Sequence, residues 1–108
     1  MNNIKELSEN LGLEEDEYIE MLDIFLASGG ADLASIEKAL KEASAEQVHR
    51  AAHSLKGSSG SLCLDSIFEI ARAIDDKARQ GILAGLDELV PKLRRAYDEL
   101  ATAVNRPA

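Results

Sequence analysis

Apolar residues recur every three or four positions along most of the chain, and no other feature of the sequence constrains the fold as strongly. The average step in the longest series is about 3.5 residues, which is typical of a helix that buries one face in a bundle. This series consists of Tyr18, Leu22, Phe25, Gly29, Leu33, Ile36, Leu40 and Ala43. Because it keeps its phase across Gly29-Gly30, we expect either one long helix with a kink at the glycines or two nearly collinear helices.

Four other segments have the same helical spacing. They are a short segment with Ile4, Leu7 and Leu11 that ends at Gly12, and longer segments over about residues 45–62, 64–80 and 86–104. Since the connections are short, consecutive helices should run antiparallel. The predicted fold class is all-α: an antiparallel up-down four-helix bundle with a short extra N-terminal helix, forming a single domain over residues 1–108.

Local signals mark some of the expected helix ends. Ser66 and Glu69 have the spacing of a capping box near the start of the segment over residues 64–80. Gly81 suits the end of this segment, because glycine readily adopts the left-handed backbone conformation that closes many helices. Asp87 is a candidate N-cap for the last helix.

Composition and charge exclude several classes of protein. Hydrophobic residues make up 45% of the 108 residues, which is enough for one apolar core and argues against disorder. No apolar run approaches the roughly 18 residues that a membrane span requires. The formal net charge of -8 argues against nucleic acid as a partner, because phosphates attract Lys and Arg. The single cysteine, Cys63, cannot form an internal disulfide, so we expect a reducing compartment, most simply the cytoplasm.

The segment over residues 45–62 has an unusual outer face. On a helical wheel its inward face consists of Val48, Ala51, Ala52, Leu55, Ser59 and Leu62. His53 lies nearly opposite the centre of this face and should therefore point to solvent. The residues that flank it on the outer face are Glu46, His49, Arg50, Lys56, Gly57 and Gly60.

Two glycines on the exposed face of a helix interior are unfavourable, since each lowers the stability of the helix by about 0.5–1 kcal/mol relative to alanine. Gly57 and Gly60 leave bare backbone beside the His53 ring, so that a second protein could approach the ring closely. Lys56, one turn away, suits an anion carried by that ring. The arrangement favours reversible phosphorylation of His53, with Lys56 stabilising the phosphoryl group. The expected docking residues for the partner are Gly57, Gly60, His49 and Arg50.

A metal site is an alternative that the same residues leave open. His49 and His53 are four residues apart, so both imidazoles could reach one ion. A closed site needs further ligands, and neither a Cys/His cluster nor a Glu-x-x-His pattern supplies them. The sequence therefore favours phosphorylation over a metal-binding helical bundle.

The stretch from Ala52 to Leu62, AHSLKGSSGSL, resembles the signature of histidine-containing phosphotransfer (HPt) domains of two-component phosphorelays. The family pattern is an Ala-His pair, one variable residue, Leu-Lys-Gly, small residues and then Leu-Gly. By this resemblance His53 is the phosphoacceptor and Lys56 assists the phosphoryl group. The same resemblance implies that Gly57 and Gly60 give clearance to the partner.

Two positions outside this stretch bear on the resemblance. Ile74-Asp75 resembles a Leu-Glu pair in the next helix of the family. Cys63 is a departure, because the family usually has at this place the glycine that ends the helix. The departure bears on the geometry of the turn and not on the chemistry at His53.

The resemblance implies a phosphoryl carrier and not a self-sufficient enzyme, since the sequence has no ATP-binding segment and no receiver-type cluster of acids. The implied partners are a response-regulator receiver domain, a sensor histidine kinase, or both. These partners bring the aspartate and Mg²⁺, so the chain holds no cofactor of its own, and we expect it to be a monomer. An HPt-like adaptor that binds a receiver domain without accepting phosphate is the alternative, and the intact His-Ser-Leu-Lys-Gly run argues against it.

Overall fold

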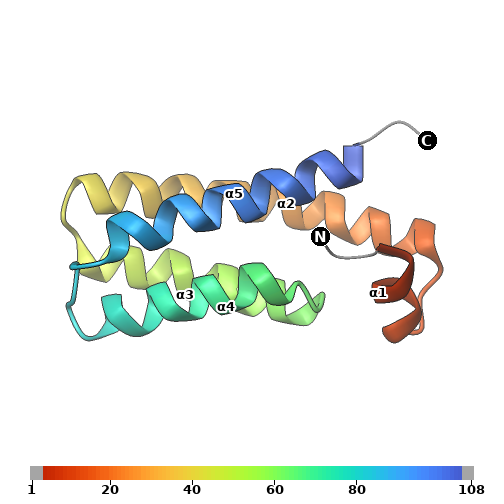
Figure 1. Ribbon diagram of the computed structural model, residues 1–108, viewed down its shortest axis with the longest axis horizontal. Coiled ribbons are helices and arrows are strands. Elements are labelled where there is room, and N and C mark those ends of the chain that lie inside the picture. The colour runs from red at the N-terminus through yellow and green to blue at the C-terminus, as the bar shows by residue number, and fades with distance from the viewer. Residues whose placement is uncertain (1–3, 106–108) are drawn as a thin grey trace.

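The computed structural model describes residues 4–105, which form five α-helices and no strand. The helices are α1 (Ile4–Asn10), α2 (Glu15–Lys41), α3 (Ala45–Ser61), α4 (Asp65–Arg79) and α5 (Leu86–Asn105). From α2 to α5 each helix runs antiparallel to the one before it (Figure 1). The predicted all-α bundle with a short extra N-terminal helix is confirmed. None of the helices in the described range combines the length and the apolar character needed to cross a bilayer.

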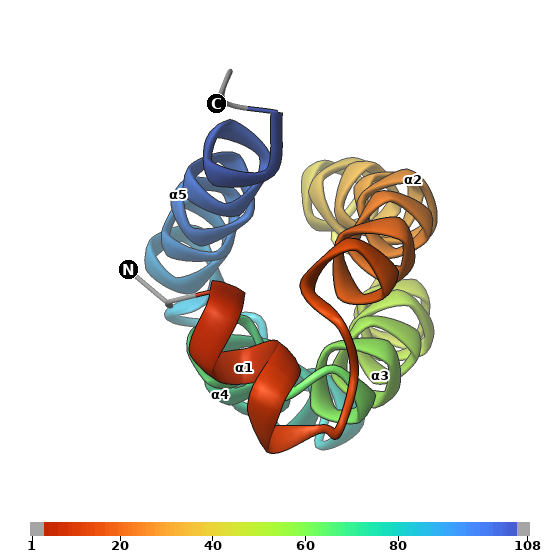
Figure 2. The same cartoon turned by 90° about the vertical axis from the view of Figure 1, so that its right-hand side faces the viewer.

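The four long helices surround one aliphatic core. Seen end-on, α2, α3, α4 and α5 follow one another around the bundle, and α5 packs against α2 to complete the circuit (Figure 2). The helix α1 packs against the N-terminal part of α2, which extends beyond the α3–α4 hairpin (Figure 1). The largest fully buried side chains include Tyr18, Leu22, Leu33, Ile36, Leu55, Ile74 and Leu93. The outer faces of α3 and α4 therefore lie side by side on one surface.

The glycine pair in α2 serves packing and does not divide the helix. The helix is continuous over 27 residues, so the expectation of two collinear helices is wrong. A Cβ at Gly29 would lie 3.3 Å from the Leu55 side chain, and one at Gly30 would lie only 2.6 Å from the Tyr97 hydroxyl oxygen. That hydroxyl donates a hydrogen bond to the carbonyl oxygen of Leu26. The missing Cβ atoms therefore let α3 and α5 approach α2 closely.

Three helices end in the same way. The residues two positions beyond α2, α3 and α4 are Ala43, Cys63 and Gly81, and their φ angles are 54°, 60° and 76°. At Cys63 the N–H donates to the Gly60 carbonyl oxygen at 3.2 Å, and the following N–H, of Leu64, donates to that of Ser59 at 3.0 Å. This pair of bonds is a Schellman motif. Gly81 closes α4 as predicted, and Cys63 takes the left-handed conformation that the glycine of the family pattern would take.

The two predicted N-terminal caps are wrong. The helix α4 begins at Asp65, with Leu64 as its N-cap, so Ser66 lies inside the first turn. The helix α5 begins at Leu86, so Asp87 also lies inside the helix. Both Leu64 and Leu86 are fully buried. Burial of these leucines in the core, and not a polar cap, fixes where the two helices begin.

Candidate functional site

The helix α3 carries the predicted site, and its sequence explains which face it exposes. Ser44 caps its N-terminus, where the hydroxyl oxygen accepts a hydrogen bond from the Gln47 N–H at 3.3 Å. The predicted inward face is confirmed, since Val48, Ala51, Ala52, Leu55, Ser59 and Leu62 are buried. On the other side of the helix, 66% of the His53 side chain is accessible to solvent. The fold therefore presents this imidazole to a second molecule.

A buried carboxylate on α4 lies beneath the exposed face of α3. The Asp75 side chain is inaccessible to solvent, yet its two oxygens contact three side chains of α3. One oxygen, Oδ1, is hydrogen-bonded to Nδ1 of His49. The other, Oδ2, lies 3.3 Å from Nδ1 of His53 and 3.1 Å from Nζ of Lys56. The site therefore spans two helices, with one acid joining two imidazoles and an ammonium group.

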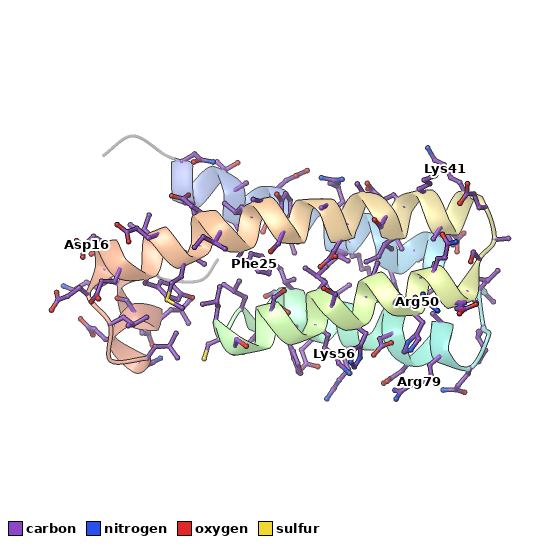
Figure 3. The ribbon with its side chains drawn as sticks, turned by 180° about the vertical axis from the view of Figure 1, so that it is seen from behind. Asp16, Phe25, Lys41, Arg50, Lys56 and Arg79 are labelled. Carbon is purple, nitrogen blue, oxygen red and sulfur yellow. The ribbon has the colours of Figure 1, made fainter. Side chains whose placement is uncertain are left out.

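Lys56 is not the freely exposed cation that the helical wheel predicted. Only 23% of its side chain is accessible, because its Nζ turns toward Asp75. In Figure 3, Lys56 lies at the edge of the bundle where α3 and α4 run together, on the side away from α2 and Lys41. Its charge therefore balances the buried carboxylate, in addition to lying one turn from His53.

The electrostatics of the site keep Asp75 ionised at neutral pH. Burial raises the pKa of its carboxyl, but hydrogen bonds from His49, Lys56 and His53 and the charge of Lys56 outweigh burial and leave this pKa below its ordinary value. An ionised carboxylate only accepts hydrogen bonds, so a neutral His53 that faces it carries its proton on Nδ1. The lone pair of the ring is then on Nε2, which is the nitrogen available for attack.

The other predicted docking residues differ in their surroundings. Arg50 forms an exposed ion pair with Glu46 at 2.9 Å. Gly57 borders open space, since a Cβ at this position would have no neighbour within 4 Å. Gly60 is exposed as well, but a Cβ there would lie 3.1 Å from the Phe68 ring of α4. The predicted exposure of both glycines is confirmed, but only Gly57 would carry a Cβ without a close neighbour.

Asp75 is the residue of the site to which the sequence assigned no role. A signal was present, because Ala71 and Ala78 lie one turn on either side of it and Ile74 precedes it. All three are buried, so an acid at this phase of α4 must also be buried. Charged side chains are seldom buried unless a partner compensates them, and the partners in this site come from α3.

The geometry gives no support to a metal site. Within residues 4–105 no group of three His, Cys, Asp or Glu side chains is arranged to hold a metal ion. His49 and His53 instead direct their Nδ1 atoms to opposite oxygens of the same carboxylate.

Comparison with known proteins agrees with the geometry of the site. The sequence profile of the Hpt domain matches residues 20–103. The chain belongs to the Hpt domain family. Its structure is similar to the crystal structure of histidine-containing phosphotransfer protein B from Pseudomonas aeruginosa PAO1, with a TM-score of 0.80 and 25% sequence identity over 95% of this chain and 87% of that chain. No curated protein is significantly similar to the chain in sequence.

Membership of the family, together with this structural similarity, supports histidine phosphotransfer in a two-component phosphorelay as the function of this chain. The resemblance seen in the sequence is thereby confirmed. The protein is a phosphocarrier and not an enzyme in the usual sense, and it interacts with receiver or kinase domains.

Proposed function

We propose that His53 accepts a phosphoryl group on Nε2 from the aspartyl phosphate of a receiver domain and passes it on to a second one. The observation that supports this assignment is the pairing of exposure with a buried acid. The chain has two histidines, and His53 is the more exposed, with 66% of its side chain accessible against 33% for His49. Its Nδ1 faces the ionised Asp75, so the opposite nitrogen faces the partner.

In the proposed step the Nε2 lone pair of His53 attacks the phosphorus atom of the aspartyl phosphate. The N–P bond forms, the P–O bond to the receiver aspartate breaks, and the released carboxylate keeps the electron pair. The proton on Nδ1 stays in place, so the phosphorylated ring carries a positive charge. Asp75, 3.3 Å away, stabilises this charge as it develops. The reverse sequence returns the phosphoryl group to an aspartate.

Lys56 has two roles in this proposal. Its contact with Asp75 holds the carboxylate in its ionised form. Because it lies one turn from His53, its ammonium group can also turn toward the phosphoryl oxygens and form a charge-assisted hydrogen bond. The chain holds no cofactor for transfer in this proposal, since the partner supplies the aspartate and Mg²⁺. We also propose that it acts as a monomer in the cytoplasm, as a single domain over residues 1–108.

The partner is proposed to dock over His53 and Gly57 and onto an adjoining groove between α2 and α3. This groove has a volume of about 300 Å³ and begins next to Gly57, at Ser58 and Ser61 of α3. On its other side are Met21 and Ile24, with 41% and 69% of their surface exposed. An apolar surface that begins five residues along α3 from His53 suits a receiver domain that must cover the ring during transfer.

Transfer of labelled phosphate from a panel of receiver domains of the source organism tests the proposal. We expect at least one phosphorylated receiver to label the wild-type chain and none to label His53→Gln. Trypsin cleaves after Arg50, so His49 and His53 fall on different peptides and the labelled histidine can be identified directly. Label on the peptide of His49 would overturn the assignment. Receiver binding without any label would instead support the adaptor that accepts no phosphate.

A further inference from the structure

The second histidine of the site has its own contact with the buried acid. Nδ1 of His49 is hydrogen-bonded to Oδ1 of Asp75, while Oδ2 serves His53 and Lys56. We infer that His49 is a positioning residue: it orients the Asp75 carboxylate and thereby fixes the tautomer of His53 that can attack phosphorus. This inference rests on the proposed function of His53.

The geometry favours His49 as the anchor of the carboxylate. Two-thirds of its side chain is shielded from solvent, whereas two-thirds of the His53 side chain is exposed. His49 contacts Oδ1, whereas His53 and Lys56 share Oδ2. A carboxylate held at one oxygen by a shielded donor cannot rotate freely about its Cβ–Cγ bond. Together with the 3.1 Å contact from Lys56 to Oδ2, His49 therefore holds Oδ2 toward His53, whose own contact is too long and too exposed to impose this orientation alone.

The tautomer of His53 depends on this orientation. An acceptor opposite Nδ1 favours the form in which Nδ1 carries the proton and Nε2 carries the lone pair. If Asp75 turns away, His53 can place its proton on Nε2 instead. That form has no lone pair at the exposed nitrogen and cannot attack phosphorus. Loss of His49 should therefore reduce the reactivity of His53 without removing the phosphoacceptor itself.

This role differs from the docking role that the sequence indicated for His49. A docking residue would affect transfer from a protein partner and leave the His53 tautomer unchanged. A positioning residue would affect the tautomer in the unphosphorylated chain and would also slow phosphorylation by a small-molecule donor. The two roles are therefore separable without knowledge of the natural partner.

A matched pair of substitutions tests the inference. His49→Asn keeps an N–H donor close to the position of the imidazole Nδ1, whereas His49→Leu has nearly the same branched shape and no donor. The tautomer of His53 is measured by ¹⁵N NMR of the imidazole, and phosphorylation is measured with phosphoramidate. Melting temperatures recorded in parallel show whether each variant is folded.

We expect His53 in the wild type and in His49→Asn to carry its proton on Nδ1. In His49→Leu we expect a shift toward the Nε2–H form and phosphorylation slower by about fivefold, which corresponds to one hydrogen bond. If His49→Leu folds and keeps both the wild-type tautomer and the wild-type rate, the inference is overturned. Equal rates for the Asn and Leu variants, both below that of the wild type, would also overturn it, because the donor would then be irrelevant.

The tautomer measurement keeps this inference distinct from the proposed function. If His53→Gln still accepts phosphate from phosphoramidate or from a receiver, the assignment of His53 fails. The NMR result for His49→Leu stands in either case, because it requires no transfer. A shifted tautomer with unchanged phosphorylation would mean that His49 orients the ring but does not control its reactivity, and would overturn the inference for the reaction.

Discussion

Nδ1 of His53 lies 3.3 Å from Oδ2 of Asp75, although 22 residues separate the two in the sequence. This contact makes α4 part of a site whose main sequence motif, from Ala52 to Leu62, lies on α3 and its C-cap. In the proposed reaction the two ring nitrogens have different roles, since Nδ1 faces a buried acid and Nε2 accepts the phosphoryl group. The reactivity of His53 should therefore depend on a residue that no partner can touch, because Asp75 is fully buried.

Replacement of Asp75 by Asn should slow phosphorylation of His53 by a factor of about ten or more. A single amide oxygen cannot satisfy His49, His53 and Lys56, and a neutral amide stabilises the positive ring less well than a carboxylate does. A hydrogen bond to a charged group contributes about 1.5–3 kcal/mol, which corresponds to one to two orders of magnitude in rate. The rate of labelling by phosphoramidate measures the effect without a partner protein.

The neighbouring Asp76 provides the control for this substitution. Its side chain is half exposed and pairs with Arg79 of the same helix. Asp76→Asn removes the same charge from α4 but touches none of the site residues, so it should retain the wild-type labelling rate. An equal loss of rate in both variants would mean that the effect comes from net charge and not from the contact with His53.

The stability contributed by Asp75 should depend on pH. The pKa of this carboxyl is lower in the folded chain than its ordinary value. Its contacts therefore stabilise the fold fully above the pKa of the unfolded state, and this stabilisation is lost as the pH falls through the pKa of the folded state. Urea unfolding of the wild type and of Asp75→Asn should therefore show the largest difference in free energy near pH 7. The difference should narrow below about pH 4, where the unfolded carboxyl is protonated. A difference that grows toward acid pH would contradict the sign of the shift.

The sequence was sufficient to predict the bundle, which follows from the apolar spacing of five segments and their short connections, and the exposure of His53, which follows from the spacing of one helix. Apolar spacing shows which side of α3 is buried, and His53 is opposite that side whatever the other helices do. The partner of His53 could not be predicted in the same way. The contact with Asp75 depends on how far α4 is shifted along α3 and how it is rotated, and neither quantity is encoded in the spacing of either helix alone.

The roles of several glycines could not be predicted from the sequence either. From the sequence, Gly29-Gly30 looked like an interruption of a helix and Gly60 looked like clearance for a partner. In the fold, Gly30 makes room for the Tyr97 hydroxyl and Gly60 for the Phe68 ring. Both contacts join different helices, so a missing side chain has the same appearance in the sequence whether it faces a neighbouring helix or solvent. Of these glycines, only Gly57 would carry a Cβ with no neighbour within 4 Å.

Replacement of Ala43 by glycine should stabilise the fold. Ala43 has a φ of 54° at the end of α2, where a residue with a Cβ is strained by about 1–2 kcal/mol. Relief of this strain is offset by about 0.4–1 kcal/mol, because glycine has greater freedom in the unfolded chain. We therefore expect Ala43→Gly to raise the free energy of unfolding by about 0.5–1 kcal/mol and the melting temperature by a few degrees. Gly81→Ala, at the matching position after α4, should have the opposite effect. Thermal unfolding of both variants checks the pair, and destabilisation by Ala43→Gly would show that the strain is absent.

Gly57 and Gly60 should respond differently to alanine, and Gly57 should distinguish partner clearance from chemistry. Gly57→Ala should stabilise α3 by up to about 1 kcal/mol, because the site is helical and its Cβ meets nothing within 4 Å. Gly60→Ala should stabilise α3 less, since its Cβ would press on the Phe68 ring at 3.1 Å.

Gly57→Leu should slow transfer from a phosphorylated receiver while phosphorylation by phosphoramidate stays at the wild-type rate, because only a protein partner needs the bare backbone. Slow labelling by both donors would place Gly57 in the reaction itself, and undiminished transfer from the receiver would show that the partner does not approach over this face of α3.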